Sequence, residues 1–258
     1  MAQADAGRGA PRPGLELLPT AACIVIGNEI LSGKTADTNS GFLARELYAL
    51  GVGLRRILVV PDEHQEIVAA LRSVQPRYDW VFTSGGVGPT HDDITLEAVA
   101  QALGRGLERN PGLAERIARH YDVGRNPLAL RMADLPQGAV LIESPATRVP
   151  VVQVENVFVL PGVPAIFERK LVAIRDRFRA APFHLRQVFL RVGEVEIAQS
   201  LYDLVARHPG LGLGSYPVLD QPEYEVKLTL ESRDRELVER ALADLLLRLP
   251  AGAVVRTA

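Results

Sequence analysis

Residues 80–95, WVFTSGGVGPTHDDIT, decide the fold of this chain. The stretch opens on an apolar run, 80–82, that is typical of the end of a buried strand, and at Thr95 a helical pattern, LEAVAQALG, follows. Three glycines, Gly85, Gly86 and Gly88, lie between them. A glycine-rich turn from a strand into a helix directs backbone N–H groups at an anion, and glycine lets a ligand approach the main chain closely. The stretch therefore predicts a phosphate-binding turn.

Two adjacent acids, Asp92 and Asp93, follow the glycines. Negative charge beside an anion site is unfavourable unless a cation bridges the two, and a hard divalent metal bound together with a phosphate would do so. Taken alone, a glycine-rich turn is common, and Asp93 also fits the N-cap of the following helix. These simpler interpretations explain the whole stretch less well.

The composition is that of an ordinary globular protein, with 47% hydrophobic and 23% charged residues among 258 and a net charge of −2. This length allows one large domain or two modest ones. The absence of a basic surplus argues against nucleic-acid binding, and no apolar run approaches the ~20 residues of a membrane span. We therefore expect a cytoplasmic protein. Its single cysteine, Cys23, lies in an apolar run and is expected to be buried rather than reactive.

Three strand–helix units follow an N-terminal segment, Met1 to Pro19, that is rich in Ala, Gly, Pro and Arg and is expected to be a disordered leader. Strands are expected at 20–26, 54–60 and 80–84, and helices at 42–50, 64–73 and 96–103. Repeated strand–helix units predict an α/β fold, with a mostly parallel sheet and helices on both faces. This first domain is expected to cover 20–180.

Polar residues follow the carboxyl end of each of these strands. Glu29 comes after the first, Asp62 after the second and the 84–93 turn after the third. In open α/β sheets this edge is where ligands bind, so these residues are expected to form one site.

Further elements complete the first domain. A helix is expected at 111–121, a short helix or turn at 126–136, and strands, some of them antiparallel, at 139–143, 149–154 and 157–160. The last strand runs into Pro161-Gly162-Val163-Pro164, and a helix is expected from 165 to about 178.

A second, small α+β domain is expected at 183–258, after a boundary at Ala180-Ala181-Pro182. Its pattern is strand 184–192, helix 194–207, strands 211–216 and 224–231, helix 233–248 and strand 253–256. This β-α-β-β-α-β order is the split-βαβ arrangement. The glycines at 210, 212 and 214 favour a bulged or closely packed strand over a ligand loop.

Four motifs together, GNEILSG, VPDE, TSGGVGPTHDD and LPGVP, resemble the molybdopterin-binding fold. Molybdopterin adenylyltransferases, the competence-damage-inducible protein CinA and the N-terminal part of eukaryotic FAD synthases share this fold. The resemblance covers 20 to the C-terminus. THDD and LGLGSYP (211–217) are most similar to the FAD synthase group, and CinA proteins also carry a small α+β domain after the fold.

The resemblance implies a divalent-metal-dependent pyrophosphatase acting on a nucleotide such as ADP-ribose or FAD. The chain shows neither the adenylyltransferase domain of FAD synthase nor the deamidase domain of CinA, so it is not expected to make FAD. By this resemblance Asp62 and Asp93 would hold Mg²⁺, Mn²⁺ or Co²⁺, and Glu29 would be a third ligand or the base for the attacking water. The family are oligomers, so a dimer or trimer is expected.

The substrate, a small nucleotide or pterin, is expected to contact the turns after the strands. The 84–88 amides would hold one phosphate, and Pro161 and Gly162 would hold another phosphate or the sugar. His91 is a weaker phosphate candidate, since a lone loop histidine is more often solvated. The full set of expected substrate contacts is Gly27, Asn28, Asn39, Ser84, Gly85, Gly86, Gly88, Thr90, His91, Pro161, Gly162 and Pro164.

Two other functions use the same pocket. One is adenylyl transfer to molybdopterin in molybdenum cofactor biosynthesis; the appended small domain argues against it, because simple adenylyltransferases of this fold end soon after the LPG motif. The other is a non-catalytic pterin- or nucleotide-binding module. The acidic residues Glu29, Asp62, Asp92 and Asp93 argue against that, because a pure binder has no need of an acidic cluster beside an anion.

Overall fold

A computed structural model describes residues 19–124, 126–219 and 222–258. The expected leader, apart from Pro19, lies outside the described residues. The described chain forms two compact units, an α/β unit at 19–180 and a C-terminal unit at 181–258. None of the helices in the described ranges is long and apolar enough to span a bilayer.

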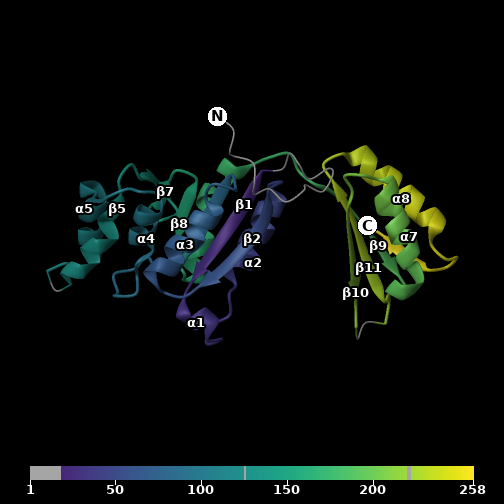
Figure 1. The fold of residues 1–258 in the computed structure, drawn as a ribbon, viewed down its shortest axis with the longest axis horizontal. Coiled ribbons are helices and arrows are strands. Elements are labelled where there is room, and N and C mark those ends of the chain that lie inside the picture. Colours follow the sequence, from purple (N-terminus) through teal and green to yellow (C-terminus); the bar gives the residue numbers. More distant parts are fainter. Residues whose placement is uncertain (1–18, 125, 220–221) are drawn as a thin grey trace. The chain divides into compact units, whose positions relative to one another are not determined.

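The α/β unit, drawn from purple to green in Figure 1, is built on a six-stranded sheet. The strand order is β2-β1-β3-β8-β7-β6. Strands β2, β1, β3 and β8 are parallel, whereas β7 is antiparallel to β8 and β6 is antiparallel to β7. The predicted mostly parallel sheet, with antiparallel strands in its last part, is confirmed. The strands are β1 (Thr20–Ile26), β2 (Gly53–Val60), β3 (Trp80–Ser84), β6 (Val140–Ile142), β7 (Val151–Val154) and β8 (Val157–Leu160).

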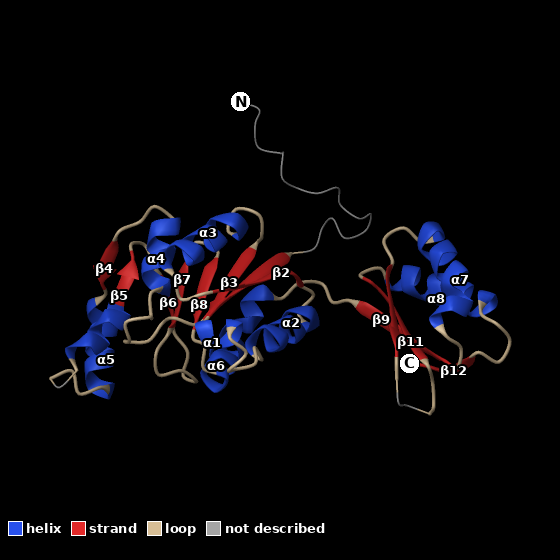
Figure 2. Ribbon diagram, turned by 60° about the horizontal axis from the view of Figure 1, so that its bottom comes forward, coloured by secondary structure: helices blue, strands red, loops and turns tan. Residues whose placement is uncertain are grey.

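Helices cover both faces of this sheet, as predicted (Figure 2). Successive side chains of β1 point to opposite faces of the sheet, which gives two hydrophobic cores. Ala22, Ile24 and Ile26 pack in the core beside α3 and α4. Residues 21, 23 and 25 pack in the core beside α2 and α6. Cys23 is fully buried, and burial raises the pKa of its thiol, so it is no nucleophile. The four helices are α2 (Asn39–Ala49), α3 (His64–Val74), α4 (Thr95–Ala102) and α6 (Pro164–Ile174).

Helix α2 begins at Asn39, three residues before its predicted start, because the Asp37 carboxylate accepts the N–H of Ser40 and caps the first turn.

The shorter elements differ most from the sequence prediction. A two-stranded ribbon of β4 and β5 was not predicted; its strands are too short for a periodic pattern, and Arg109 pairs with Asp134 across it at 2.7 Å. These elements are α1 (Asn28–Leu31), β4 (Leu107–Arg109), α5 (Pro111–His120), the 3₁₀ helices η1 (Pro127–Ala133) and η2 (Arg175–Phe178), and β5 (Asp134–Pro136).

The C-terminal unit has the predicted β-α-β-β-α-β order. Its antiparallel sheet runs β10-β11-β9-β12, which places the first and third strands of the unit at the centre. The unit consists of β9 (His184–Leu190), α7 (Glu194–Arg207), β10 (Gly212–Pro217), β11 (Val226–Ser232), α8 (Arg235–Arg248) and β12 (Val254–Thr257).

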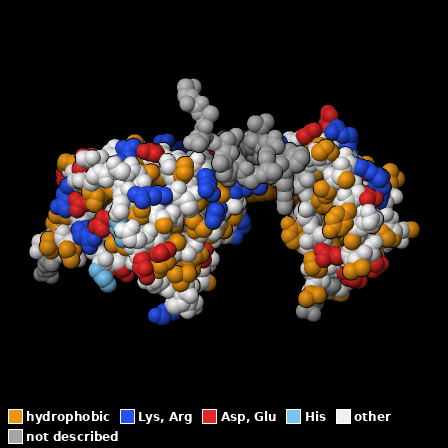
Figure 3. Space-filling view, viewed as in Figure 1, with side chains coloured by type: hydrophobic (Ala, Val, Ile, Leu, Met, Phe, Trp, Pro, Cys, Tyr) orange, Lys and Arg blue, Asp and Glu red, His pale blue; other side chains and the backbone are white. Residues whose placement is uncertain are grey.

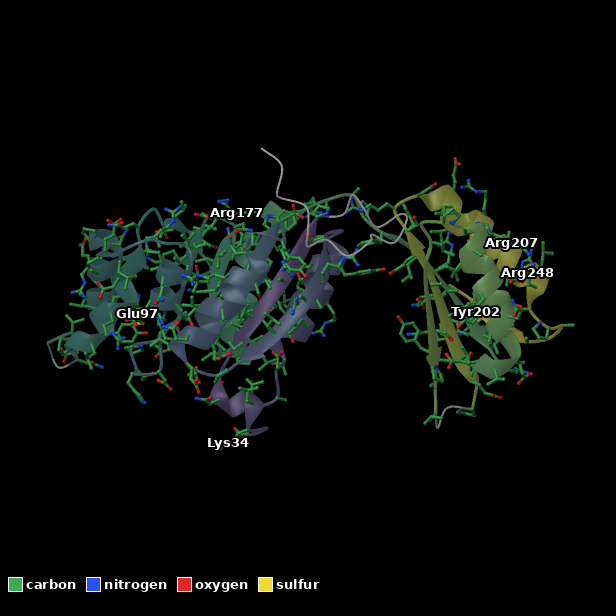
Figure 4. The ribbon with its side chains drawn as sticks, viewed as in Figure 1. Lys34, Glu97, Arg177, Tyr202, Arg207 and Arg248 are labelled. Carbon is green, nitrogen blue, oxygen red and sulfur yellow. The ribbon has the colours of Figure 1, made fainter. Side chains whose placement is uncertain are left out.

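Side-chain contacts tie α7 to α8. Asp244 on α8 accepts a hydrogen bond from Arg248 at 2.8 Å and lies 3.2 Å from His208, the residue that follows α7. Arg207, the last residue of α7, lies 3.8 Å from the same carboxylate, and Figure 4 labels Arg207 and Arg248 on the two helices. Gly212 and Gly214 lie on β10, and this strand is closely packed, because a Cβ on Gly214 would lie 2.7 Å from the Tyr216 ring. Figure 3 shows hydrophobic side chains exposed among charged ones on this unit. Tyr202 of α7, labelled in Figure 4, is an exposed hydrophobic side chain of the unit.

Candidate functional site

The carboxyl ends of β1, β3 and β8 lie next to one another, so the turns that follow them meet at one edge of the sheet. Backbone hydrogen bonds join these turns to neighbouring strands. The Gly27 N–H donates to the Val60 carbonyl of β2, and the Gly85 N–H donates to the Leu160 carbonyl of β8, both at 3.1 Å. The structure therefore brings the GNEILSG, VPDE, SGGVG and LPGVP motifs to the same edge.

Glycines allow these turns to pack directly against each other. Gly85 has φ +116°, and a Cβ there would overlap the carbonyl oxygen of Ile26. A Cβ on Gly162 would lie only 3.3 Å from the Cα of Gly85, and one on Gly86 would overlap the Thr95 hydroxyl. The sequence interpretation was that Gly85 and Gly86 lack a Cβ so that a ligand can approach the main chain. This interpretation is corrected, because atoms of Ile26 and Thr95 occupy the positions where the Cβ atoms would be.

Unpaired amides begin only after Gly85. The Gly85 N–H donates a hydrogen bond to the Leu160 carbonyl, and Ser84 is the last residue of strand β3. In the described part of the chain, the N–H groups of Gly86, Val87 and Gly88 donate no hydrogen bond to another residue. Consecutive unpaired amides form an anion-binding concavity. The predicted phosphate contact at 84–88 is therefore narrowed to 86–88.

The Asp93 carboxylate lies beside these amides. Its Oδ2 accepts the backbone N–H of Thr90 at 2.8 Å and is 2.6 Å from where a Cβ on Gly88 would be. Asp92 is exposed and accepts the Thr90 hydroxyl, which lowers the pKa of Asp92. Neither aspartate caps α4, because the N-cap residue is Ile94 and, among the described residues, no side chain accepts an N–H of the first turn. The N-cap interpretation is wrong here, and both carboxylates instead shape the turn.

His91 projects into solvent at the tip of the same turn. Its side chain is 98% exposed, and its ring nitrogen is 3.9 Å from the Asp92 carboxylate. The structure thus gives His91 no fixed direction toward the amides.

Asp62 follows β2, and Glu29 lies on α1, directly after β1. Asp62 Oδ2 accepts the N–H of Asn28 at 2.8 Å and so joins the end of β2 to the start of α1. The Glu29 carboxylate folds back over Gly27, where a Cβ would overlap it. Across the described ranges, no three His, Cys, Asp or Glu side chains are grouped so as to hold a metal ion. Glu29, Asp62 and Asp93 are therefore not a ready-made three-carboxylate centre.

The chemistry of the donors nevertheless suits a hard divalent cation. Asp62 and Asp93 offer carboxylate oxygens, which Mg²⁺ and Mn²⁺ prefer, and Mg²⁺ usually takes only one or two carboxylates from a protein together with phosphate oxygens and water. Asp62 and Asp93 follow β2 and β3, which lie on either side of β1 in the sheet, so the two carboxylates would come from the turns that flank the turn after β1.

A small cavity of about 40 Å³ lies at the same edge. Asn39 forms part of its wall and is 95% buried; its Nδ2 donates to Ser84 Oγ at 2.9 Å and to the Gly162 carbonyl at 2.8 Å. Asn39 Oδ1 is buried with no hydrogen-bond partner. A buried acceptor without a donor is costly, so a donor group of a ligand or a water is expected here.

The cavity wall contains only some of the predicted residues. Glu29, Asn39, Ser84, Gly162 and Pro164 contribute to it, and so do Asp37 and Thr38, which were not predicted as site residues. The remaining predicted residues lie outside this wall: Gly27, Asn28, Asp62, Gly85, Gly86, Gly88, Thr90, His91, Asp93 and Pro161. The cavity has room for a few waters or one small group, so a nucleotide would lie mainly over the open turns.

Arg131, on η1, is a residue at this edge that the sequence did not reveal. Its guanidinium lies 3.4 Å from the Thr90 carbonyl and forms an ion pair of 3.0 Å with Glu97 on α4, which is labelled in Figure 4. Nothing in the spacing around 126–136 connects this residue with the glycine turn. Only the folded structure places a positive charge there.

This fold and these turns define a molybdopterin-binding type of α/β domain. A family model described as "Probable molybdopterin binding domain" matches residues 22–176, and a second, "FAD synthase, middle domain", matches 182–258. The chain belongs to the molybdopterin-binding-domain family.

Individual relatives agree with this assignment. A "Probable FAD synthase" of Caenorhabditis elegans is 35% identical over 92% of the chain and 51% of its own length, and a "CinA-like protein" of Myxococcus xanthus is 34% identical over 84% and 55%. The crystal structure of a CinA protein of unknown function from Thermoplasma acidophilum is 36% identical in sequence and superposes with a TM-score of 0.58. The match covers 62% of this chain and 98% of that chain. The chain spans about half the length of the FAD synthase relatives that it matches.

Proposed function

We propose that the α/β unit is a metal-dependent pyrophosphatase that hydrolyses the phosphoanhydride bond of a nucleotide such as ADP-ribose or FAD. One observation carries the proposal: the unpaired amides of 86–88 adjoin the Asp93 carboxylate. An anion cradle and a carboxylate repel the same ligand unless a cation joins them, so the pair favours a phosphate bound together with a divalent metal.

The chain's own groups divide the remaining work. The amides of Gly86, Val87 and Gly88 bind one phosphate, and Asn39 Oδ1 accepts a hydrogen bond from a hydroxyl or amino group of the ligand. Asp62 and Asp93 would hold Mg²⁺, Mn²⁺ or Co²⁺, and the bound ion would supply charge neutralisation for the phosphate and a lower pKa for water. Glu29, beside the cavity, takes the proton of the attacking water.

Two observations support other functions for the same edge. The missing three-carboxylate group in the described ranges favours a nucleotide- or pterin-binding module without catalysis. The family match favours a molybdopterin ligand, and with it adenylyl transfer. A location in the cytoplasm and assembly into a dimer or trimer stay predictions from the sequence.

One assay separates these functions. The purified protein is incubated with ADP-ribose, with FAD, and with molybdopterin plus ATP, each with Mg²⁺, Mn²⁺ or Co²⁺, and products are identified by mass. AMP from ADP-ribose or FAD that appears only with metal supports the proposal. Adenylylated molybdopterin supports transfer, and saturable binding without product supports the module.

A further inference from the structure

A larger cavity, of about 510 Å³, lies elsewhere in the α/β unit, between α5 and the 143–150 loop that joins β6 to β7. Three arginines and one histidine line it, against a single acid, Glu143. Arg116, Arg119 and His120 come from α5, and Arg148 comes from the loop. With the histidine neutral, its lining carries a formal charge of +2. Figure 3 shows basic side chains among acidic ones at the end of the unit that carries α5.

Sheet topology places this cavity at the same edge as the site already described. Strand β6 is antiparallel to β7, and β7 is antiparallel to β8, so β6 and β8 point in the same direction. Glu143, the residue after β6, therefore leaves the sheet at the carboxyl edge. Strand β6 is three places from β3 in the sheet, which corresponds to ~14 Å at the usual strand spacing.

Local pairing leaves much of the positive charge in this cavity unsatisfied. Arg116 pairs with Glu143 at 2.7 Å, and Arg119 pairs with Glu115 at 3.4 Å in an exposed ion pair, of the kind that contributes little to stability. Arg148 makes no ion pair with any described residue.

The helix end accounts for only part of this arrangement. Arg119 and His120 in the last turn of α5 stabilise the negative end of its dipole. That reason does not apply to Arg148, which lies in the loop opposite. The His120 Nδ1 contacts the Arg116 carbonyl at 2.8 Å; since a carbonyl only accepts, Nδ1 carries the hydrogen and Nε2 stays available.

We propose that this cavity binds a phosphate group of a phosphorylated small molecule. Arg119 and Arg148, from two sides, supply guanidinium groups, which bind phosphate oxygens in pairs of parallel hydrogen bonds. Ser144 accepts the Ala146 amide with its hydroxyl oxygen and keeps its hydroxyl hydrogen for a ligand. The site does not depend on the proposed hydrolysis. Its phosphate belongs either to the far end of a ligand that also occupies the glycine turn or to a separate molecule.

Titration with inorganic pyrophosphate by calorimetry, without divalent metal, tests the proposal. Arg148→Gln and Arg119→Gln are each expected to weaken binding at least about tenfold, the effect of losing one charge-assisted hydrogen bond. The matched control is Arg177→Gln, which removes an exposed arginine from η2, away from both sites (Figure 4). It should bind as the wild type does. Circular dichroism and urea unfolding check that each variant is folded.

Pyrophosphate bound at the 86–88 amides would persist in the Arg148 and Arg119 variants, so only the difference between variants reports on this cavity. Equal affinity of all four proteins, or no saturable binding by the wild type, would overturn the proposal. The same variants titrated with ADP-ribose identify the source of the phosphate. A parallel loss of affinity assigns it to a ligand that spans both sites, and unchanged affinity assigns it to a separate phosphorylated molecule.

Discussion

Gly85 packs against the carbonyl oxygen of Ile26 so closely that a single methyl group on Gly85 would overlap that oxygen. Gly85 also has φ +116°, in the region that only glycine adopts without strain. This contact joins the turns after β1 and β3, and with them the two halves of the candidate site.

Gly85→Ala is therefore expected to lower the free energy of unfolding by at least about 3 kcal/mol, the sum of backbone strain and overpacking. Gly104→Ala is the matched control: Gly104 has φ +66° but nothing within 4 Å of the added methyl group. It should cost only about 1 kcal/mol. Urea unfolding measures both, and similar losses would show that the packing of Gly85 against Ile26 is unimportant.

Arg131→Met should loosen the glycine turn, because it removes the guanidinium that lies between the Thr90 carbonyl and Glu97. We expect at least about tenfold weaker binding of ADP-ribose with little change in overall stability. Arg109→Met is the control, since it breaks a shorter ion pair, with Asp134, that does not touch the turn. Calorimetry with both variants checks this, and a normal affinity for Arg131→Met would exclude a positioning role.

Lys170 is expected to make stability depend on pH. It is 92% buried and donates to the Pro150 carbonyl at 3.0 Å, and burial lowers its pKa to about 8. Between pH 8 and its ordinary value of 10.5 the unfolded chain binds the proton more strongly than the folded one. Stability therefore rises with pH across this window, by about 2 kcal/mol from pH 7 to 10.

Comparison with Lys170→Met isolates this contribution from that of other groups. The variant should be more stable than the wild type at pH 7, and the difference should shrink toward pH 10 in urea unfolding. A constant difference between the two proteins would mean that Lys170 is solvated enough to keep its ordinary pKa.

Much of the fold could be predicted because its signals are local. Strand β8 was expected at 157–160 and occurs there, since a buried apolar run ending at Pro161 marks both its nature and its end. The common edge of Glu29, Asp62 and the glycine turn could be predicted because each follows the carboxyl end of a strand in a parallel sheet. The β4–β5 ribbon gave no such signal, because three exposed residues in β4 carry no periodicity.

The details of the site depend on contacts that a sequence does not contain. The number of unpaired amides in the turn depends on a long-range contact, because the carbonyl of Leu160, in the distant strand β8, accepts the Gly85 N–H. The role of Gly85 itself was misinterpreted for the same reason, because its neighbour Ile26 lies 59 residues earlier. Arg131 and Arg148 could not be assigned, because the elements that they face are separated from them in sequence.

The central claim is that Asp62 and Asp93, rather than Asp92, support metal-dependent hydrolysis. Asparagine keeps one oxygen acceptor at each position, so the contacts of Asp62 with Asn28 and of Asp93 with Thr90 survive while the negative charge is lost. Asp92→Asn is the control on the same turn, because that carboxylate is exposed, accepts the Thr90 hydroxyl and lies 3.9 Å from the ring nitrogen of the neighbouring His91.

The most direct test is the rate of ADP-ribose hydrolysis with Mn²⁺ by the wild type and these three variants. Asp62→Asn and Asp93→Asn should each lose at least ~100-fold in kcat, as expected when a positioned charged group is removed, while Asp92→Asn should stay within about threefold of the wild type. An active Asp93→Asn beside an inactive Asp92→Asn would contradict the ligand assignment. Equal rates in all four proteins, or no metal-dependent hydrolysis by the wild type, would contradict the proposed enzyme.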